Sequence, residues 1–100
     1  KMKFTIIKDD QAVYEDGDAI EGVDLSDLPE DLHALHWDGN SGEIEWKTVT
    51  TPNQEISSED EIESALGVSF TALRERRTAR IAEIQAELDA QAEALQAENG

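Results

Sequence analysis

The sequence predicts an α+β fold: a small antiparallel β-sheet of two hairpins, followed by a short helix and a long C-terminal helix with coiled-coil character. Residues 1–50 alternate β-branched and aromatic segments with turn-forming residues, whereas residues 58–98 are dominated by strong helix formers. A β-branched run that ends at Pro52 separates the two regions. We therefore divide the chain into a β-rich domain, residues 1–56, and a helical C-terminal region, residues 57–100.

The first predicted hairpin joins residues 3–8 to residues 11–14. The first of these segments has the aromatic and β-branched content of a strand, and the aspartate pair that follows signals a turn. Residues 15–31 contain two glycines and a proline, so we expect a loop there.

The second predicted hairpin has strands at residues 32–37 and 43–48. The turn between them, residues 38–42, contains an Asp-Gly pair and a second glycine, which suit positive φ angles. The return strand alternates strictly between apolar and charged side chains, as in a sheet that is covered on one face. The simplest arrangement places four large apolar side chains on that face: Leu35, Trp37, Ile44 and Trp46. They form either a core or a docking face, and strand alternation favours the core.

Two helices are predicted in the C-terminal region. The first spans residues 58–66, because Ser58 and Glu61 fit a capping box and Gly67 suits the position after a helix end. The second spans residues 69–98, with Ser69 as its cap and no glycine or proline inside it. At 1.5 Å per residue this helix is roughly 43 Å long, longer than the core of so short a chain is wide.

Apolar residues form a stripe near the C-terminal end of the long helix. Ile81, Ile84, Leu88 and Leu95 are separated by steps of three, four and seven residues, which is typical of a coiled-coil seam. Isoleucine at both kinds of seam position favours three or more strands over two. The stripe either packs on the sheet of its own chain or binds another chain, and the length of the helix favours another chain.

Charge is the other strong feature of the sequence. There are 24 acidic and 8 basic side chains, a net charge of −16, which argues against direct binding to nucleic acid. Arg74, Arg76, Arg77 and Arg80 form a basic cluster on the long helix. They either dock an acidic patch on a partner or balance nearby acids such as Glu83, and we favour charge balance.

Motifs for catalysis or metal binding are missing from the sequence. There is no cysteine, and His33 and His36 lie on a predicted strand at a spacing that points them to opposite faces. The aspartate clusters lack the full ligand pattern of a calcium loop, and candidate nucleophiles have no matching base. No segment reaches the roughly 18 consecutive apolar residues of a membrane span. We expect a protein that is not an enzyme, holds no metal or cofactor, and binds neither nucleic acid nor membranes.

Residues 23–29 and the two-tryptophan hairpin of residues 33–46, with its Gly-Glu-Ile-Glu return strand, carry a family resemblance. Over residues 2–48 the chain resembles small proteins encoded beside the tail-fibre genes of tailed bacteriophages. The resemblance implies a fibre assembly or attachment protein that binds a fibre or tail polypeptide. It would act in the host cytoplasm during assembly, or remain in the virion tail. Because fibres are commonly trimeric, the resemblance agrees with a homotrimer formed by the long helix.

A different interpretation starts from the net charge alone. A surface rich in carboxylates can imitate DNA and so inhibit a host nucleic-acid enzyme. Such a mimic needs its carboxylates in rows on one face, whereas here they are spread over loops and both halves of the chain. Solubility is the simpler explanation of the charge, and the DNA mimic is kept as the alternative function.

Overall fold

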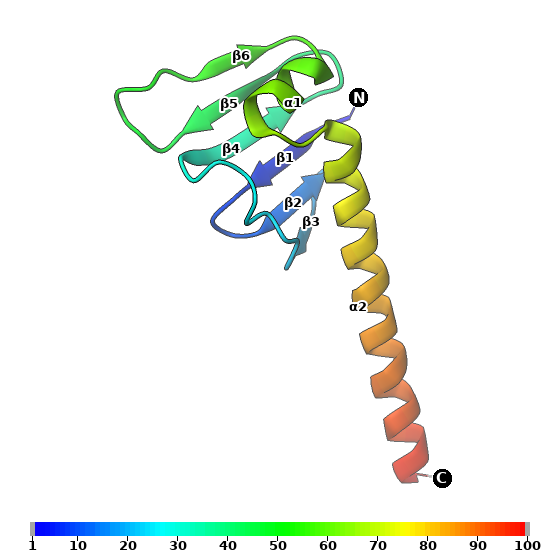
Figure 1. The fold of residues 1–100 in the computed structure, drawn as a ribbon. Coiled ribbons are helices and arrows are strands. Elements are labelled where there is room, and N and C mark those ends of the chain that lie inside the picture. Colours follow the sequence, from blue (N-terminus) through cyan, green and yellow to red (C-terminus); the bar gives the residue numbers. More distant parts are fainter. Residues whose placement is uncertain (1, 100) are drawn as a thin grey trace.

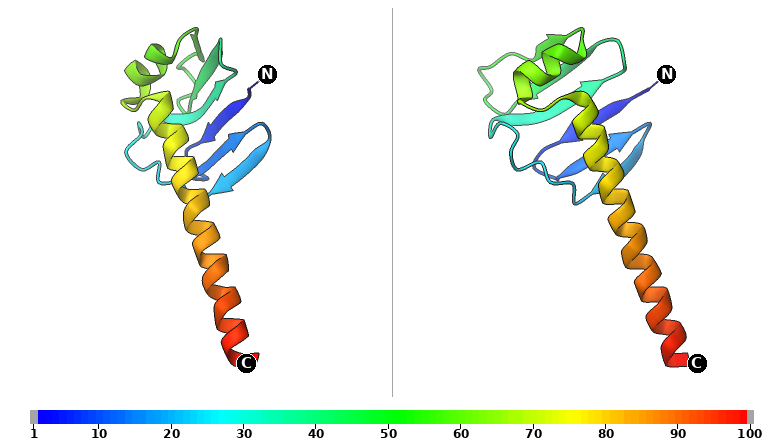
Figure 2. Two further views of the ribbon diagram at one scale, coloured as in Figure 1. Left: turned by 90° about the vertical axis from the view of Figure 1, so that its right-hand side faces the viewer. Right: turned by 45° about the vertical axis from the view of Figure 1, so that its right-hand side comes forward.

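The computed structural model describes residues 2–99 and has the predicted α+β class (Figure 1). One antiparallel sheet is followed by a short helix, α1 (Glu59–Leu66), and a long helix, α2 (Phe70–Asn99). The six strands are β1 (Phe4–Ile7), β2 (Ala12–Glu15), β3 (Asp18–Glu21), β4 (Leu32–Trp37), β5 (Gly42–Trp46) and β6 (Gln54–Ile56). The molecule is elongated, 59 × 28 × 20 Å, because α2 projects far beyond the sheet (Figures 1 and 2).

Both predicted hairpins are present in the sheet, whose strand order is β3-β2-β1-β4-β5-β6. Strands β1 and β2 form the first hairpin, and β4 and β5 form the second. Pairing of β1 with β4 joins the hairpins and sets Phe4 opposite Trp37 and Ile6 opposite Leu35. A register shift between Leu32 and Ala34 lets both Leu32 and Leu35 enter the core.

The two edge strands, β3 and β6, were not predicted. Strand β3 lies inside the segment expected to be a loop, and three of its four residues are exposed, so it lacks an apolar alternation. It follows a two-residue turn in which Asp16 and Gly17 both have positive φ angles, the conformation that Asp-Gly favours in hairpins. Strand β6 has three residues, of which one is buried.

The core lies between one face of the sheet and the two helices. Its members come from the sheet, from the loop after β3, from α1 and from the first turns of α2. The rings of Phe4 in β1 and Phe70 in α2 meet edge to face, with centroids 4.9 Å apart. Because the core cluster includes Ile62 of α1 and Leu73 of α2, the β-rich and helical regions share one core.

The helix boundaries follow from local capping, as predicted. The Ser58 hydroxyl accepts a hydrogen bond from the Glu61 backbone N–H, and Gly67 has the left-handed φ of 78° that ends α1. The carboxylate of Glu61 accepts the backbone N–H of Ser57, one residue earlier than in a standard capping box. The Ser69 hydroxyl accepts the backbone N–H of Ala72 at 3.1 Å and so caps α2.

Candidate interaction surface

Helix α2 has a proximal segment, residues 70–80, that packs on the sheet, and a distal segment, residues 81–99, that extends beyond it (Figure 1). Leu73 is fully buried, and it is the last apolar residue along α2 in the core cluster. The distal segment is about 28 Å long at 1.5 Å per residue. Its end lies far from the sheet in every view (Figure 2).

The predicted stripe is largely exposed. Ile81 is 39%, Leu88 54% and Leu95 60% exposed, while Ile84 is half-buried. At about 100° per residue, the stripe lies on the same side of the helix as Phe70 and Leu73. It therefore continues the face that docks on the sheet, but from Ile81 onward no member belongs to the core cluster. Coiled-coil pairing of this stripe stays a prediction.

The predicted sheet face forms part of the core and is not open for docking. Leu35 and Ile44 are fully buried, and Trp37 is 3% exposed and packs beside the ring of Phe70. Trp46 is half-buried at the margin of the core. Of the two sets of residues singled out in the sequence, only the helix stripe presents a surface to a partner.

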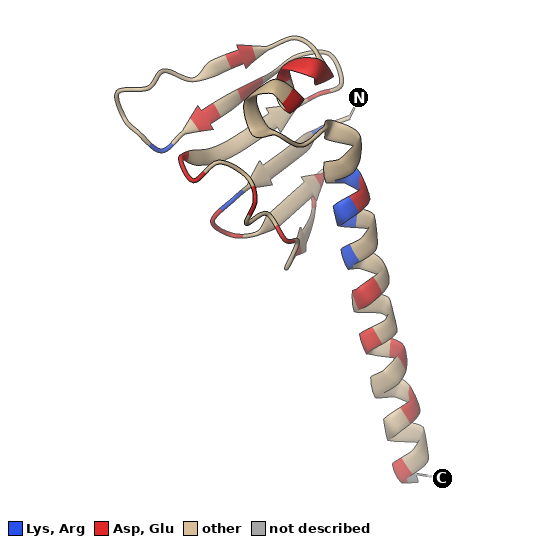
Figure 3. Cartoon of the chain, viewed as in Figure 1, with Lys and Arg blue, Asp and Glu red and all other residues tan. Residues whose placement is uncertain are grey.

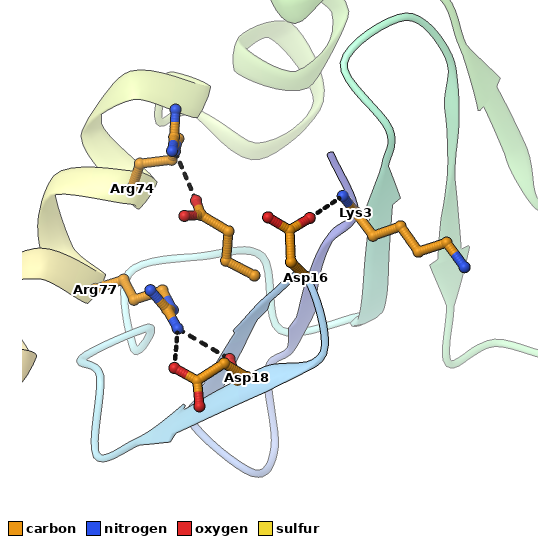
Figure 4. Close-up of polar contacts among 6 residues, drawn as sticks. Lys3, Asp16, Asp18, Arg74 and Arg77 are labelled. Atoms are coloured by element: carbon orange, nitrogen blue, oxygen red, sulfur yellow. Dashed lines mark hydrogen bonds and ion pairs between the residues drawn. The ribbon is translucent and has the colours of Figure 1, made fainter. Parts of the chain in front are cut away.

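The four arginines of the proximal segment, which we name the arginine clasp (Arg74, Arg76, Arg77 and Arg80), hold α2 on its own chain. Arg77 is the most buried of them. Its Nη2 donates to the backbone oxygen of Asp18 at 3.0 Å and to the Asp18 carboxylate at 2.8 Å (Figure 4). Arg76 makes a two-pronged contact, in which Nη1 and Nη2 donate to the two carboxylate oxygens of Asp27 at 2.7 and 2.8 Å.

The outer two members of the clasp bind the β2 and β3 strands. Arg74 Nε donates to the Glu15 carboxylate at 2.7 Å (Figure 4), and Arg80 Nε donates to the backbone oxygen of Glu21 at 3.0 Å. Arg80 also lies 3.8 Å from Glu83, the neighbour expected from the sequence. The arginines are therefore balanced mainly by tertiary contacts with the sheet region. These contacts were not predicted from the sequence.

Ion pairing favours the charged forms of two members of the clasp and of one of their acceptors. The hydrogen bond from Arg76 lowers the pKa of Asp27, and the same bond raises the pKa of Arg76. The pKa of Arg74 is raised chiefly by its hydrogen bond to Glu15. The Arg76–Asp27 pair can therefore be weakened by acid, and by salt because it is exposed.

Charge is unevenly distributed along α2 (Figure 3). All four basic residues lie in the proximal segment, whereas residues 81–99 carry acidic side chains and no lysine or arginine. The acidic residues there are Glu83, Glu87, Asp89, Glu93 and Glu98. At about 100° per residue they spread over roughly the half of the helix surface that faces away from the stripe, and they do not form one row.

A hydroxyl, an imidazole and a carboxylate lie in a row across the uncovered face of the sheet. Thr5 Oγ1 is 3.4 Å from His36 Nδ1, and His36 Nε2 is 3.1 Å from Glu45 Oε2. This row was not predicted, because the pairing of β1 with β4 brings Thr5 beside His36 from 31 residues away. The His36 side chain is 44% exposed, so the row lacks the water-excluded surroundings that strengthen nucleophilic catalysis. We interpret it as cross-strand polar pairing.

An open depression of about 860 Å³ lies where β1, β4, β5 and β6 meet. Two carboxylates that line it are already bonded within the chain, Glu43 to Asn53 and Glu61 to Ser57. Among residues 2–99 no cluster of three or more histidine or acidic side chains is arranged to hold a metal ion. Over the same residues, neither helix has an apolar stretch long enough to cross a lipid bilayer.

Comparison with known proteins gives no relative: no family, no curated protein and no solved structure matches this chain.

Proposed function

We propose that this chain is a tail-fibre assembly or attachment protein of a tailed bacteriophage, and that it holds a fibre or tail polypeptide through the distal segment of α2. One observation carries the proposal. Three large apolar side chains, Ile81, Leu88 and Leu95, are at least 39% exposed on one face of a helix that leaves its own core. An exposed apolar face of a helix is a common element of recognition between chains.

The way in which α2 is attached supports a binding role for its distal segment. Leu73 and Phe70 are anchored in the core, and the arginine clasp adds tertiary bonds over the next two turns. The helix therefore leaves the sheet in a defined direction, which lowers the entropy that a partner must overcome to order it. In this proposal the sheet region is the scaffold that presents the helix, and no reaction is catalysed.

The identity of the partner comes from the resemblance of residues 2–48 to proteins encoded beside tail-fibre genes. The resemblance implies either an assembly factor for the fibre or a minor component attached to the tail. A small acidic scaffold with one projecting apolar helix suits either task. We expect an assembly protein to act in the host cytoplasm. An attachment protein would use the same contact and remain in the virion tail.

An acidic mimic of DNA is the second candidate, because the distal segment carries five acidic residues and no basic ones. Such a mimic would present this helix to the DNA site of a host enzyme. The exposed apolar stripe on the same helix favours a protein partner over that function, since a DNA site is polar and positively charged.

A pull-down from the cells that produce the protein tests the proposal. The bait is the tagged chain, and captured proteins are identified by mass. We expect a fibre or tail polypeptide, with at least about a tenfold loss of capture for the double variant Leu88→Gln and Leu95→Gln. The matched control is Ala90→Gln with Ala97→Gln, which has the same spacing on the opposite side of the helix.

Two results would overturn the proposal. Capture of a nucleic-acid enzyme that DNA displaces would establish the mimic instead. Equal capture of the fibre polypeptide by the stripe variant and by the control would show that the stripe is not the binding surface.

A further inference from the structure

The position of the sheet relative to α2 restricts what can cover the stripe. Phe70, Leu73 and Arg77 are buried against the sheet region, and the stripe lies on the same side of the helix. The space on this side of α2 is therefore closed by the sheet region along the proximal segment and open along the distal segment (Figure 1). Only a chain that ends near the sheet, or turns away from it, can lie along the whole stripe.

We infer that, before the partner is bound, the stripe is covered by the stripe of a second copy of this chain, running antiparallel. The inference rests on the proposed function, because it concerns the same surface and names what shields it. A parallel copy in register would bring its own sheet into the space that the first sheet occupies. The homotrimer expected from the sequence has this difficulty, since its helices would be parallel. An antiparallel copy places its sheet at the opposite end.

The spacing of the stripe fits a two-fold axis at Leu88. With Ala92 included, the apolar positions are 81, 84, 88, 92 and 95, with steps of three, four, four and three. This order is the same in both directions. Antiparallel pairing about Leu88 matches Leu88 with Leu88 and Ile81 with Leu95 of the second copy. Ile84 and Ala92 lie on opposite edges of the stripe, so Ile84 faces Gln91 of the second copy. The central and outer side chains of the stripe, at positions 81, 88 and 95, therefore meet apolar ones, as in a self-complementary two-fold interface.

Most of the charge along the distal segment lies away from this pairing. At about 100° per residue, uncharged Gln85, Gln91 and Ala92 flank the stripe. Glu98 and Glu87 lie at its border, and Glu87 is 3.6 Å from Arg80 of its own chain. Glu83 and Glu93 lie on the outer side of the helix, away from the second copy. Acidic side chains that stay exposed to water and salt repel only weakly, so the five acids do not prevent two distal segments from meeting.

The size of the contact limits its strength. A helix of about 28 Å covers less than the roughly 800 Å² per partner of a standard interface. We therefore expect a dimer that dissociates on dilution and yields to a fibre polypeptide that offers a larger surface. The dimer shields the stripe until the partner takes it.

Disulfide capture tests the pairing directly, because the chain has no cysteine of its own. One sample of the full chain carries Ile81→Cys and another carries Leu95→Cys. The two are mixed at high concentration and oxidised, and the products are identified by mass. We expect mixed disulfides between the two variants in at least about fivefold excess over those of the control pair. The control is Glu83→Cys mixed with Glu93→Cys, at matching heights about Leu88 but on the outer side.

Each other outcome overturns the inference. Disulfides mainly between identical variants would show a parallel pair, and no excess over the control would show that a second copy does not cover the stripe. Sedimentation of the unmodified chain gives a second measurement, in which a monomer at every concentration from about 10 μM to about 1 mM contradicts the dimer. Capture of the fibre polypeptide is measured in a separate pull-down. A monomer that still captures this polypeptide would overturn only this inference and would leave the proposed function unaffected.

Discussion

The proximal and distal segments of α2 have the same secondary structure and direct their apolar side chains to the same side, yet only one of them is packed. Leu73 is fully buried, whereas Leu88, about four turns further on, is 54% exposed. The sheet is too narrow to reach the distal segment, and the arginine clasp ends at Arg80. An apolar helix face therefore predicts that a neighbour will cover it. The width of the sheet decides how much of that face is covered by the chain itself.

The largest expected difference between the segments is in core packing. Leu73→Ala should lower the free energy of unfolding by about 2–5 kcal/mol, because it opens a cavity beneath α2. Leu88→Ala should change it by less than about 0.5 kcal/mol in the dilute monomer, because no core contact is lost. Urea denaturation of both variants at low protein concentration measures the two values. Equal losses would show that the distal segment contributes to the stability of the fold.

The next largest effect is expected in the arginine clasp, where Arg77 is more deeply buried than Arg76. The Arg77 side chain is 10% exposed and bonds both the carboxylate and the backbone oxygen of Asp18, so Arg77→Ala should cost about 1–3 kcal/mol. The Arg76 side chain is 30% exposed and Asp27 is 54% exposed, so Arg76→Ala should cost at most about 1 kcal/mol.

Urea denaturation in low and high salt checks the ranking of these two variants. The loss for Arg76→Ala should shrink in high salt, because the exposed ion pair is screened. Arg77→Met keeps the apolar stem and should recover part of the stability that Arg77→Ala loses. A greater loss at Arg76 than at Arg77 would contradict the role of burial.

A smaller effect is expected at the start of α2. Ser69→Ala removes the acceptor for the Ala72 backbone N–H and should lower stability by about 1 kcal/mol. Ser64→Ala, on the exposed side of α1, is the matched control and should stay within about 0.5 kcal/mol of the parent. Thermal unfolding followed by circular dichroism compares the two. A loss at Ser64 as large as that at Ser69 would mean that the cap is not its source.

The smallest expected effect is the pH dependence of one clasp pair. The pKa of Asp27 is lowered in the folded chain by Arg76, so this carboxylate adds stability above its ordinary pKa of about 3.9. That stability is lost as the pH falls through the lowered pKa. The advantage of the parent over Arg76→Gln should therefore be complete at neutral pH and vanish in strong acid. Urea midpoints of both chains across this range provide the measurement, and a difference that does not change with pH would exclude the linkage.

Much of the fold could be predicted from the sequence because its signals act over a few residues. Ser58, Gly67 and Ser69 define helix ends through bonds to residues three or four positions away. The Asp-Gly turn at residues 38–42 and the alternation after it likewise predicted the second hairpin. Strand β3 was missed because an exposed edge strand has no apolar pattern, although its Asp16-Gly17 turn was a signal that could have indicated it.

The sequence by itself determined which side of α2 is apolar, where this helix begins and ends, and that the helix is longer than the core is wide. Only the tertiary structure decided where that core ends and what the arginines bind. Arg77 and Asp18 are 59 residues apart, and Thr5 and His36 are 31 apart. Helical periodicity and capping are properties of neighbouring residues, whereas these contacts depend on the order of strands in the sheet and on the direction in which α2 crosses it. That direction also leaves the stripe beyond the sheet edge, where another chain can reach it.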